Sequence, residues 1–409
     1  MPPEVLITGI GIVSPAGVGT PATWQALLAG RRCVDRAANL DLAGCATDFC
    51  AQVRDFTAPA GTEELDRVCQ FAVAAAEEAV GHAKLSLPEA AARSMVCVGT
   101  SKGGILSFAH LAPLLTESRH RGQVLDLRTL SSIPPDAPAR CIAKRFGITG
   151  GVHATVAACS TGTLAIIRAA RFIEDGHADV VLAGSADASL HKLWFAAFEQ
   201  MGILAPAHPE RGAAWSGRPF DRTRAGLVLG EGAAILVLES GQSARRRGVD
   251  PIARLAGSAS GTDPAGLAQV SSDGESLAQV IRLACERAGC RGADIACIHA
   301  HGTGTPANDR AEACSLRLVF GDRAAAVPVV SIKGAIGHLL GGAGAVEIAA
   351  AALSCREGVS PGTPTLIEPD GELGLHSLPR EAFSPARGPV LKTSLGFGGQ
   401  VAAVVLTPV

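Results

Sequence analysis

Three short segments of this sequence place chemically reactive side chains among small residues. They are residues 157–162 (AACSTG), 301–306 (HGTGTP) and 333–338 (KGAIGH). Cys159, in the first segment, would supply a thiolate, which is a good nucleophile toward thioesters. The imidazoles of His301 and His338 can donate hydrogen bonds to a carbonyl or take part in proton transfer near neutral pH. These groups predict an enzyme that holds an acyl group on cysteine and joins it to a second acyl unit.

The residues around Cys159 distinguish it from an ordinary cysteine. A single cysteine is more often a small hydrophobic side chain than a nucleophile, and a single histidine usually makes a structural hydrogen bond. Here an apolar stretch, 152–158, leads into Cys159, and residues 161–173 have the apolar periodicity of a helix. A cysteine at such a turn lies near a helix N-terminus, where the dipole and the unpaired N–H groups favour the thiolate. Its own N–H is also placed to help bind an oxyanion.

The composition is typical of a well-buried α/β protein. The chain has 409 residues, 47% of them hydrophobic and 18% charged, and it contains 48 glycines. This length suits two domains or one large duplicated unit. A net charge of −2 provides no general attraction to nucleic acid or to an anionic membrane, so we expect neither as a partner.

The sequence also predicts a cytoplasmic protein that needs no metal and no organic cofactor. The chain enters an apolar strand directly after its first residues, and it has no apolar run of transmembrane length. The closest cysteine spacings, 45/50 and 285/290, differ from the CxxC of zinc and redox sites. The two histidines are not at helical i, i+4 spacing and lack a third ligand nearby. Scattered cysteines in a chain of this length fit a reducing compartment.

Strand-like apolar runs alternate with alanine-rich helical stretches along the whole chain, which predicts an α/β fold with buried strands. The predicted strands include 5–8, 94–99 and 180–183, and the predicted helices include 21–29 and 71–83. A glycine turn that feeds an apolar strand occurs twice, at 230–238 and at 396–406. We interpret this internal repeat as a duplication, with coincidence as the alternative. The predicted halves are 1–240, with the cysteine, and 251–409, with both histidines.

Taken together, the motifs resemble those of an elongating β-ketoacyl-[acyl carrier protein] synthase, within the thiolase-like superfamily. The resemblance covers nearly the whole chain and rests on residues 7–15, 157–162, 218–221 with 230–233, 301–306, 333–338 and 396–399. It implies a five-layer α-β-α-β-α sandwich built from two pseudo-duplicated halves. It also implies an acyl carrier protein as the partner that delivers acyl and malonyl groups, and usually a homodimer.

The resemblance further implies roles for the reactive residues. Cys159 would take an acyl group from the phosphopantetheine arm of the carrier. His301 and His338 would polarise the carbonyl of the malonyl thioester, stabilising the enolate that forms when carbon dioxide leaves. The N–H groups of Cys159 and Phe397 would form an oxyanion hole, and Phe397, next to Gly398, resembles a gate that moves on acylation. The alternative for Phe397 is a core aromatic.

Other residues have implied supporting roles. Lys333 would be buried beside Glu347, whereas a lysine in a glycine-rich loop usually faces solvent. Asp309 and Glu312 would be similar supporting carboxylates, or else surface carboxylates on a helix. The expected substrate contacts are Thr303 and Thr305 with the pantetheine amides, and Phe108 at the floor of the acyl pocket. Turn chemistry is the alternative for the two threonines.

The chain departs from the family pattern in several places. Gln400-Val401 follows the last glycine motif where relatives often have Thr-Asn, and Ala225 follows Arg224 where an aspartate is common. The expected helix starting near residue 63 is mostly acidic where bacterial relatives often place lysines for carrier docking. Docking would then use another basic surface or an unusual carrier, and basic segments 119–128 and 245–247 are candidate surfaces, or simply solvated faces. The bulky Phe108 favours short or unusually shaped acyl groups, or a pocket that a partner subunit completes.

The sequence therefore predicts decarboxylative Claisen condensation in fatty acid biosynthesis, with several alternatives. A polyketide or polyene ketosynthase, acting with a chain-length-factor partner as a heterodimer, would use the same residues. A thiolase is disfavoured because segment 396–399 contains no cysteine. Initiating synthases are disfavoured because they have asparagine in place of His338. A non-catalytic, carrier-binding subunit would lack the nucleophile, whereas Cys159 is present.

Overall fold

The computed structural model describes residues 2–87, 91–118 and 127–409. Its strands belong to one large mixed sheet and one two-stranded sheet. The strands are β1 (Val5–Ser14), β2 (Gly17–Val18), β3 (Asp35–Arg36), β4 (Phe49–Cys50), β5 (Ser94–Gly99), β6 (Val152–His153), β7 (Val180–Asp187), β8 (Gly232–Ser240), β9 (Ala253–Thr262), β10 (Cys297–His299), β11 (Val329–Val330), β12 (Val390–Gly396) and β13 (Gln400–Thr407). The helices are α1 (Thr20–Leu28), α2 (Arg67–His82), α4 (Ile105–Ser118), α5 (Leu127–Ser131), α6 (Ala137–Phe146), α7 (Thr161–Glu174), α8 (Lys192–Gln200), α9 (Gly241–Arg247), α10 (Glu275–Ala288), α11 (Pro306–Phe320), α12 (Lys333–Ile336) and α13 (Ala343–Glu357).

The large sheet consists of two five-stranded parts with the same plan, and the short strand β2 pairs with β1 beside them. The first part has the order β6-β5-β7-β8-β1, and the second has the order β11-β10-β12-β13-β9. In each part the first three strands are parallel, and the last two continue the sheet in antiparallel pairs. The parts join where Leu6 and Ile7 of β1 pair with Arg254 and Ala253 of β9. The two strands of the internal repeat in the sequence, β8 and β13, occupy equivalent positions in the two parts of the sheet.

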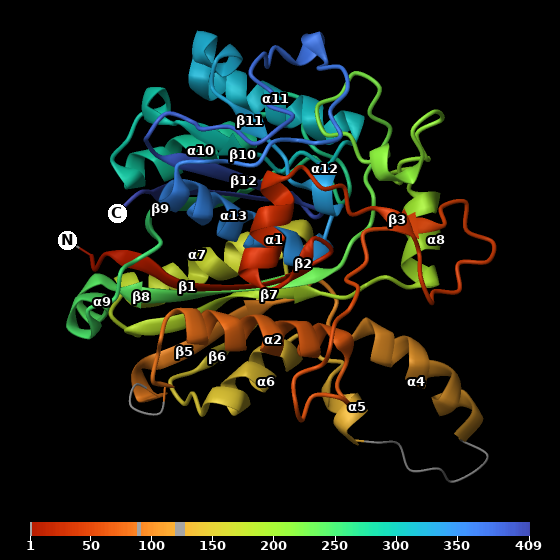
Figure 1. The fold of residues 1–409 in the computed structure, drawn as a ribbon, viewed down its shortest axis with the longest axis vertical. Coiled ribbons are helices and arrows are strands. Elements are labelled where there is room, and N and C mark those ends of the chain that lie inside the picture. Colours follow the sequence, from red (N-terminus) through yellow and green to blue (C-terminus); the bar gives the residue numbers. More distant parts are fainter. Residues whose placement is uncertain (1, 88–90, 119–126) are drawn as a thin grey trace.

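Helices cover both parts of the sheet in layers (Figure 1). The helices α2 and α6 lie on the outer face of the first part, and α10 and α11 lie on the outer face of the second. Between the two parts lie α7 and α13, and every residue of α13 from Ala343 to Cys355 is buried. This order of layers confirms the predicted α/β sandwich.

Glycines allow the two central helices to approach each other closely. A Cβ atom on Gly162 of α7 would lie 2.5 Å from the backbone nitrogen of Ala345, and one on Gly344 of α13 would lie 2.7 Å from that of Thr163. Both distances are far below van der Waals contact, so glycine is required at both positions. The contact places the helix that follows Cys159 against the helix that carries Glu347.

Most predicted elements agree with the structure, and the differences have physical causes. The strand predicted at 5–8 continues to Ser14 as β1, because Gly9 and Gly11 let α2 pack directly on the strand: a Cβ on Gly11 would lie 2.0 Å from the carbonyl oxygen of Ala75. The helix expected near residue 63 begins only at Arg67, since the Asp66 side chain caps it by accepting from the Val68 N–H at 3.0 Å.

None of the helices in the described part of the chain combines the length and the apolarity that crossing a lipid bilayer requires.

Candidate active site

One cavity of about 550 Å³ brings the three sequence motifs together. Cys159 comes from the first half of the chain, and His301 and His338 come from the second. Most of the remaining wall is apolar, and it includes Val156, Trp194, Phe198, Met201, Ile203, Leu227, Leu267, Leu340 and Phe397. Residues far apart in the sequence therefore converge on one cavity.

The turn that presents Cys159 is strained and tightly held. Ala158 has a φ of 46°, in the left-handed region that residues other than glycine seldom adopt, and a short 3₁₀ turn, Ala158–Ser160, leads into α7. The Thr161 hydroxyl fixes this turn by accepting from the Ala157 N–H at 2.9 Å and donating to the Ala158 carbonyl at 2.7 Å. The glycine-rich loop at the end of β12 approaches closely, since a Cβ on Gly396 would lie 2.8 Å from the Ala157 carbonyl oxygen.

The Cys159 thiol is half-buried in the cavity wall, and burial raises its pKa to about 11. The charges of Lys102 and Lys333 act in the opposite direction but do not offset the burial. Burial thus outweighs the preference for thiolate expected at the helix N-terminus. The resting cysteine carries its proton at neutral pH and must lose it as it attacks.

His301 is oriented as a hydrogen-bond donor toward the cavity. It is 3% exposed, and its Nδ1 lies 3.4 Å from the Lys333 ammonium nitrogen. An ammonium group can only donate, so Nδ1 accepts and the ring hydrogen lies on Nε2. Burial, followed by the nearby charge of Lys333, holds the pKa of His301 well below its usual value. The ring is therefore neutral and can donate from Nε2 to a carbonyl oxygen.

His338 is the second neutral imidazole. Its backbone is held by two hydrogen bonds, from its own N–H to the Val228 carbonyl at 2.7 Å and from the Gly230 N–H to its carbonyl at 2.9 Å. Burial, and then Lys333, hold its pKa well below the usual value. Within the described residues the buried Nδ1 has no hydrogen-bond partner. The ring lies edge-on to that of His301, with 5.4 Å between the ring centroids.

Behind the histidines lies a cluster of three buried charges. Lys333 donates to Glu347 and to the His301 carbonyl oxygen, the latter at 2.5 Å. A second lysine, Lys392 of β12, is fully buried and places its nitrogen 2.9 Å from the other carboxylate oxygen of Glu347. Lys392 lies outside the motifs that predicted the other site residues. The available signal was a lone lysine that directly follows the apolar residues Val390 and Leu391.

Two carboxylates hold the loop that contains His301. Glu312 accepts from the N–H groups of His301 at 2.7 Å and of Gly302 at 2.8 Å, and from the Thr393 hydroxyl at 2.6 Å. Asp309 accepts from the N–H of Thr303 at 3.1 Å, and burial raises its pKa to about 6. Both are fully buried rather than surface carboxylates. Neither lines the cavity, so both act on it through this loop.

Comparison with known proteins identifies the chain. The sequence matches the N-terminal domain of β-ketoacyl synthases over residues 3–244 and the C-terminal domain over residues 252–366. The chain belongs to the β-ketoacyl synthase family. It is 35% identical to the "Putative polyketide beta-ketoacyl synthase 1" of Streptomyces halstedii, covering 99% of this chain and 98% of that protein. It is 33% identical to the "3-oxoacyl-[acyl-carrier-protein] synthase 2" of Rhizobium meliloti, covering 98% of both chains.

Solved structures agree with this assignment. A type II polyketide synthase acyl-carrier protein in complex with its ketosynthase bound to the hexaketide (AntDE:AntF) matches with a TM-score of 0.91 and 29% identity over 100% of both chains. The ishigamide ketosynthase/chain length factor matches with a TM-score of 0.89 and 30% identity, also over 100% of both chains.

Further residues of this β-ketoacyl synthase line the same cavity. Phe397 is half-buried in its wall, and its backbone N–H has no hydrogen-bond partner within the described residues. Gly398 follows it in an exposed turn with a φ of 77°. Thr303 and Thr305 also line the cavity, and their hydroxyls lie 2.8 Å apart.

Phe108 does not line this cavity. It lies on α4 and is 48% exposed, because the helix that starts at Ile105 turns its side chain outward. The segment instead contributes Ser101 and Lys102 to the cavity wall. The prediction that Phe108 closes the acyl pocket therefore does not hold within a single chain.

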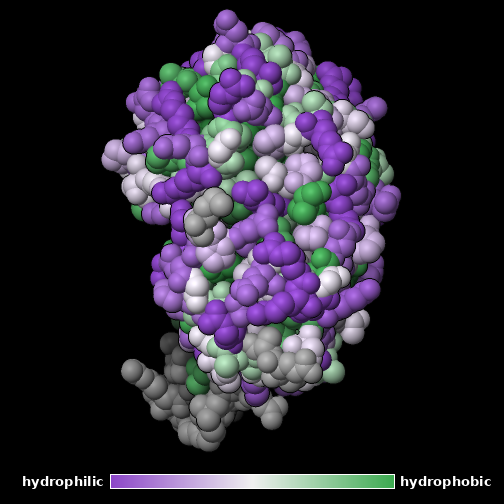
Figure 2. Space-filling model, turned by 90° about the vertical axis from the view of Figure 1, so that its left-hand side faces the viewer, coloured by the Kyte–Doolittle hydropathy of each residue, from purple (hydrophilic) through white to green (hydrophobic). Residues whose placement is uncertain are grey.

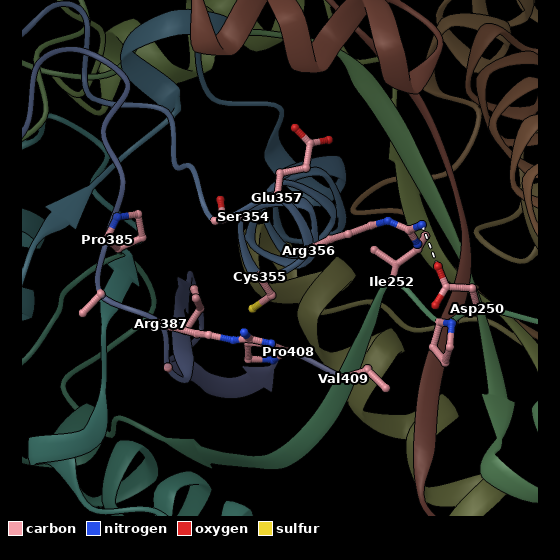
Figure 3. A pocket seen from close by; sticks show the side chains of 15 residues that line it. Asp250, Ile252, Ser354, Cys355, Arg356, Glu357, Pro385, Arg387, Pro408 and Val409 are labelled. Carbon is pink, nitrogen blue, oxygen red and sulfur yellow. Dashed lines mark hydrogen bonds and ion pairs between the residues drawn. The ribbon is translucent and has the colours of Figure 1, made fainter.

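A second cavity, of about 590 Å³, lies at the C-terminal end of α13 and is lined by different residues (Figure 3). Its Arg356 and Asp250 form an ion pair at 2.9 Å, and its Glu357 accepts from the Trp24 ring N–H at 2.7 Å. Burial raises the pKa of its Cys355 thiol to about 12. Its acidic side chains are thus paired, and none of the described residues that line it is a histidine, so we assign the chemistry to the first cavity.

The basic segment 245–247 lies far from the active-site cavity. It belongs to α9, on the opposite side of the molecule from α8, whose Trp194 lines the cavity (Figure 1). Its three arginines face the carboxylates of Glu4, Asp179 and Glu239. The face that carries α9 is largely hydrophilic, with hydrophobic residues scattered over it (Figure 2). The other basic candidate, 119–128, falls outside the described residues except for its last two.

Proposed function

We propose that this β-ketoacyl synthase condenses an acyl group on Cys159 with a malonyl group, both delivered by an acyl carrier protein. The observation that supports this most directly is the joint presence of one thiol and two neutral, donor-competent imidazoles in a single cavity. A thioester can be attacked there while its carbonyl oxygen receives a hydrogen bond.

The first half-reaction transfers the acyl group. The sulfur of Cys159 bonds to the acyl carbonyl carbon, the bond from that carbon to the pantetheine sulfur breaks, and the proton of the cysteine passes to the departing thiolate. The N–H groups of Cys159 and Phe397 bind the oxyanion of the tetrahedral intermediate. Removing one such donor typically reduces the rate by ~10²–10³-fold.

The second half-reaction forms the new carbon–carbon bond. The malonyl carboxylate leaves as carbon dioxide, and its electron pair becomes an enolate whose oxygen accepts hydrogen bonds from His301 and His338. The enolate carbon then attacks the acyl-cysteine, which releases the Cys159 thiolate to be protonated. The product is a 3-oxoacyl thioester on the carrier. Thr303 and Thr305 bind the pantetheine amides, and this reaction draws on no metal or organic cofactor.

The biosynthetic role divides into two candidates. Fatty acid elongation is supported by relatives named 3-oxoacyl-[acyl-carrier-protein] synthase 2. Polyketide synthesis, with a chain-length-factor partner, is supported by relatives named as polyketide synthases at 34–36% identity and by the ishigamide complex. We favour the polyketide role, since an acidic segment stands where fatty acid synthases often place docking lysines.

We also infer that the chain divides into halves 1–240 and 251–409. We infer a cytoplasmic location as well, which the twelve unpaired cysteines support.

The test is intact-protein mass spectrometry after incubation with a panel of acyl carrier proteins. We expect a mass gain of one acyl group in the wild type and none in Cys159→Ala. Cys159→Gln should release carbon dioxide from the malonyl carrier without forming 3-oxoacyl product, because the histidines remain in place. Condensation by either variant would remove Cys159 from the mechanism.

A further inference from the structure

The cavity wall beside Cys159 contains a lysine in otherwise apolar surroundings. Lys102 follows β5, and its side chain is only 14% exposed. Its ammonium nitrogen donates to the Ser101 hydroxyl at 2.6 Å and lies 4.9 Å from the centre of the Trp194 ring. Its charge also acts on Cys159, which places it close to the reacting sulfur.

The nearest carboxylate, Asp187, does not saturate this ammonium group. Asp187 already accepts from four other donors, namely the Ser101 N–H, the Ser101 hydroxyl, the Ser189 hydroxyl and the Gly341 N–H. Its closest oxygen lies 3.9 Å from the Lys102 nitrogen, which is beyond hydrogen-bond distance. An ammonium group has three protons, so Lys102 retains donor capacity toward the cavity.

Trp194 supplies a second donor in the same wall. Its indole Nε1 is buried and has no hydrogen-bond partner within the described residues. A buried donor without an acceptor is unfavourable, and the neighbouring Phe198 and Leu340 offer none. Two neighbouring side chains in the wall of a mostly apolar cavity therefore carry hydrogen-bond donors that the described residues leave unsaturated.

We propose that Lys102 and Trp194 bind an oxygen of the acyl group, so that the enzyme selects acyl chains with a carbonyl or carboxylate beyond the thioester. This inference rests on the proposed acyl transfer to Cys159. A saturated chain would bury both donors without an acceptor, whereas an oxygenated chain would satisfy them. Lys102 and Trp194 are thus specificity-determining residues.

The experiment compares three N-acetylcysteamine thioesters of equal chain length: hexanoyl, 3-oxohexanoyl and the monothioester of adipic acid. Acylation rates of the full chain are followed by intact-protein mass spectrometry, with Cys159→Ala as the blank. We expect an oxygenated thioester to react at least ~10-fold faster than hexanoyl, because a site built to hydrogen-bond its substrate discriminates strongly against an analogue without the acceptor. A preference for the 3-oxo chain identifies a carbonyl ligand, and a preference for the adipic chain identifies a carboxylate.

Two variants test whether these side chains cause the preference for oxygenated chains. Lys102→Met keeps the approximate size of the side chain, and Trp194→Phe keeps an aromatic ring, but each removes a hydrogen-bond donor. Each variant should therefore reduce the ratio of oxygenated to hexanoyl rates. The ratio is the measured quantity, because loss of the Lys102 charge also raises the pKa of Cys159 and slows all three thioesters together. Lys144→Met, an exposed site on α6, is the matched control and should leave the ratio unchanged. Lys102→Arg should restore part of the preference.

The outcomes separate this inference from the proposed function. Equal acylation rates of the wild type with the three thioesters would overturn the role of Lys102 and Trp194. The same conclusion would follow if both variants unfolded at the temperature of the wild type and kept its ratio of oxygenated to hexanoyl rates. A wild type that none of the thioesters and none of the loaded carriers acylates would overturn the acyl transfer itself.

Discussion

At the scale of single residues, burial and then a cluster of buried charges keep the two histidines neutral. Two lysines share one glutamate, Glu347, so this cluster carries a net positive charge close to His301 and His338. Lys392 is also linked through the Ser394 hydroxyl, at 3.1 Å and then 2.7 Å, to Thr163 in the first turn of α7. One buried side chain thus connects the histidines with the helix behind the nucleophile.

Removing this charge should change the pH dependence of decarboxylation. Lys392 lowers the pKa of both histidines, after the larger effects of burial and Lys333. In Lys392→Met both pKa values rise, so the imidazoles become protonated at a higher pH as the solution is acidified. We expect the pH at which the rate of malonyl decarboxylation falls on acidification to move higher. The rate is measured as carbon dioxide release from a malonyl thioester over a range of pH. Lys144→Met should not move this pH. A folded Lys392→Met protein in which this pH is unmoved would contradict this electrostatic role.

At the scale of helices and strands, the packing of α7 on α13 determines where Cys159 lies relative to Glu347. A Cβ on Gly162 would lie 2.4 Å from the Ser185 hydroxyl as well as against Ala345. The helices cannot separate without moving both motifs. Geometry at the active site therefore depends on a contact that involves no reactive side chain.

Adding one methyl group at this contact should destabilise the fold. We expect Gly162→Ala to lower the free energy of unfolding by about 1–3 kcal/mol, the usual effect of overpacking. Gly81→Ala is the matched control: it lies near the end of α2, and its Cβ would meet nothing within 4 Å. There the better helix propensity of alanine should stabilise by up to ~1 kcal/mol. Denaturant titration of both variants measures the difference, and effects of the same sign would contradict the packing argument.

The helices, strands and motif residues could be predicted because their signals are local in the sequence. Strand β5 agrees with the predicted 94–99 at both ends, and α7 with the predicted 161–173 to within one residue. The roles of Lys392 and Trp194 could not be predicted, since they depend on contacts between segments distant in the chain. Phe108 was predicted as a pocket residue from its segment alone, whereas its side chain on α4 is 48% exposed, and the direction of a helix face depends on packing that a short segment does not reveal.

At the scale of the whole molecule, the two ends of the large sheet differ. At one end, β11 is completely buried, and Val329 also bonds to the carbonyl of Ser377. At the other end, β5 is the one described strand that pairs with β6, and the β6 residue Val152 is 38% exposed. Val156, which follows in the chain, is 56% exposed and also lines the active-site cavity. An open strand edge with exposed apolar side chains is a site for pairing with another chain.

We therefore expect the chain to form a dimer through the β6 edge, with a second copy or a related subunit covering one wall of the cavity. Val152→Lys places a charge at this edge and should shift the purified protein from dimer to monomer, as measured by size-exclusion chromatography with light scattering. Val18→Lys is the control, since Val18 is a similarly exposed valine, at 43%, on the short strand β2. Acylation of Cys159 should decline with the dimer in the first variant and remain in the second, because Val156 belongs to both the exposed edge and the cavity wall. A dimer that survives Val152→Lys would place the interface elsewhere, and a monomeric wild type would favour a separate chain-length-factor subunit as the partner that completes the cavity.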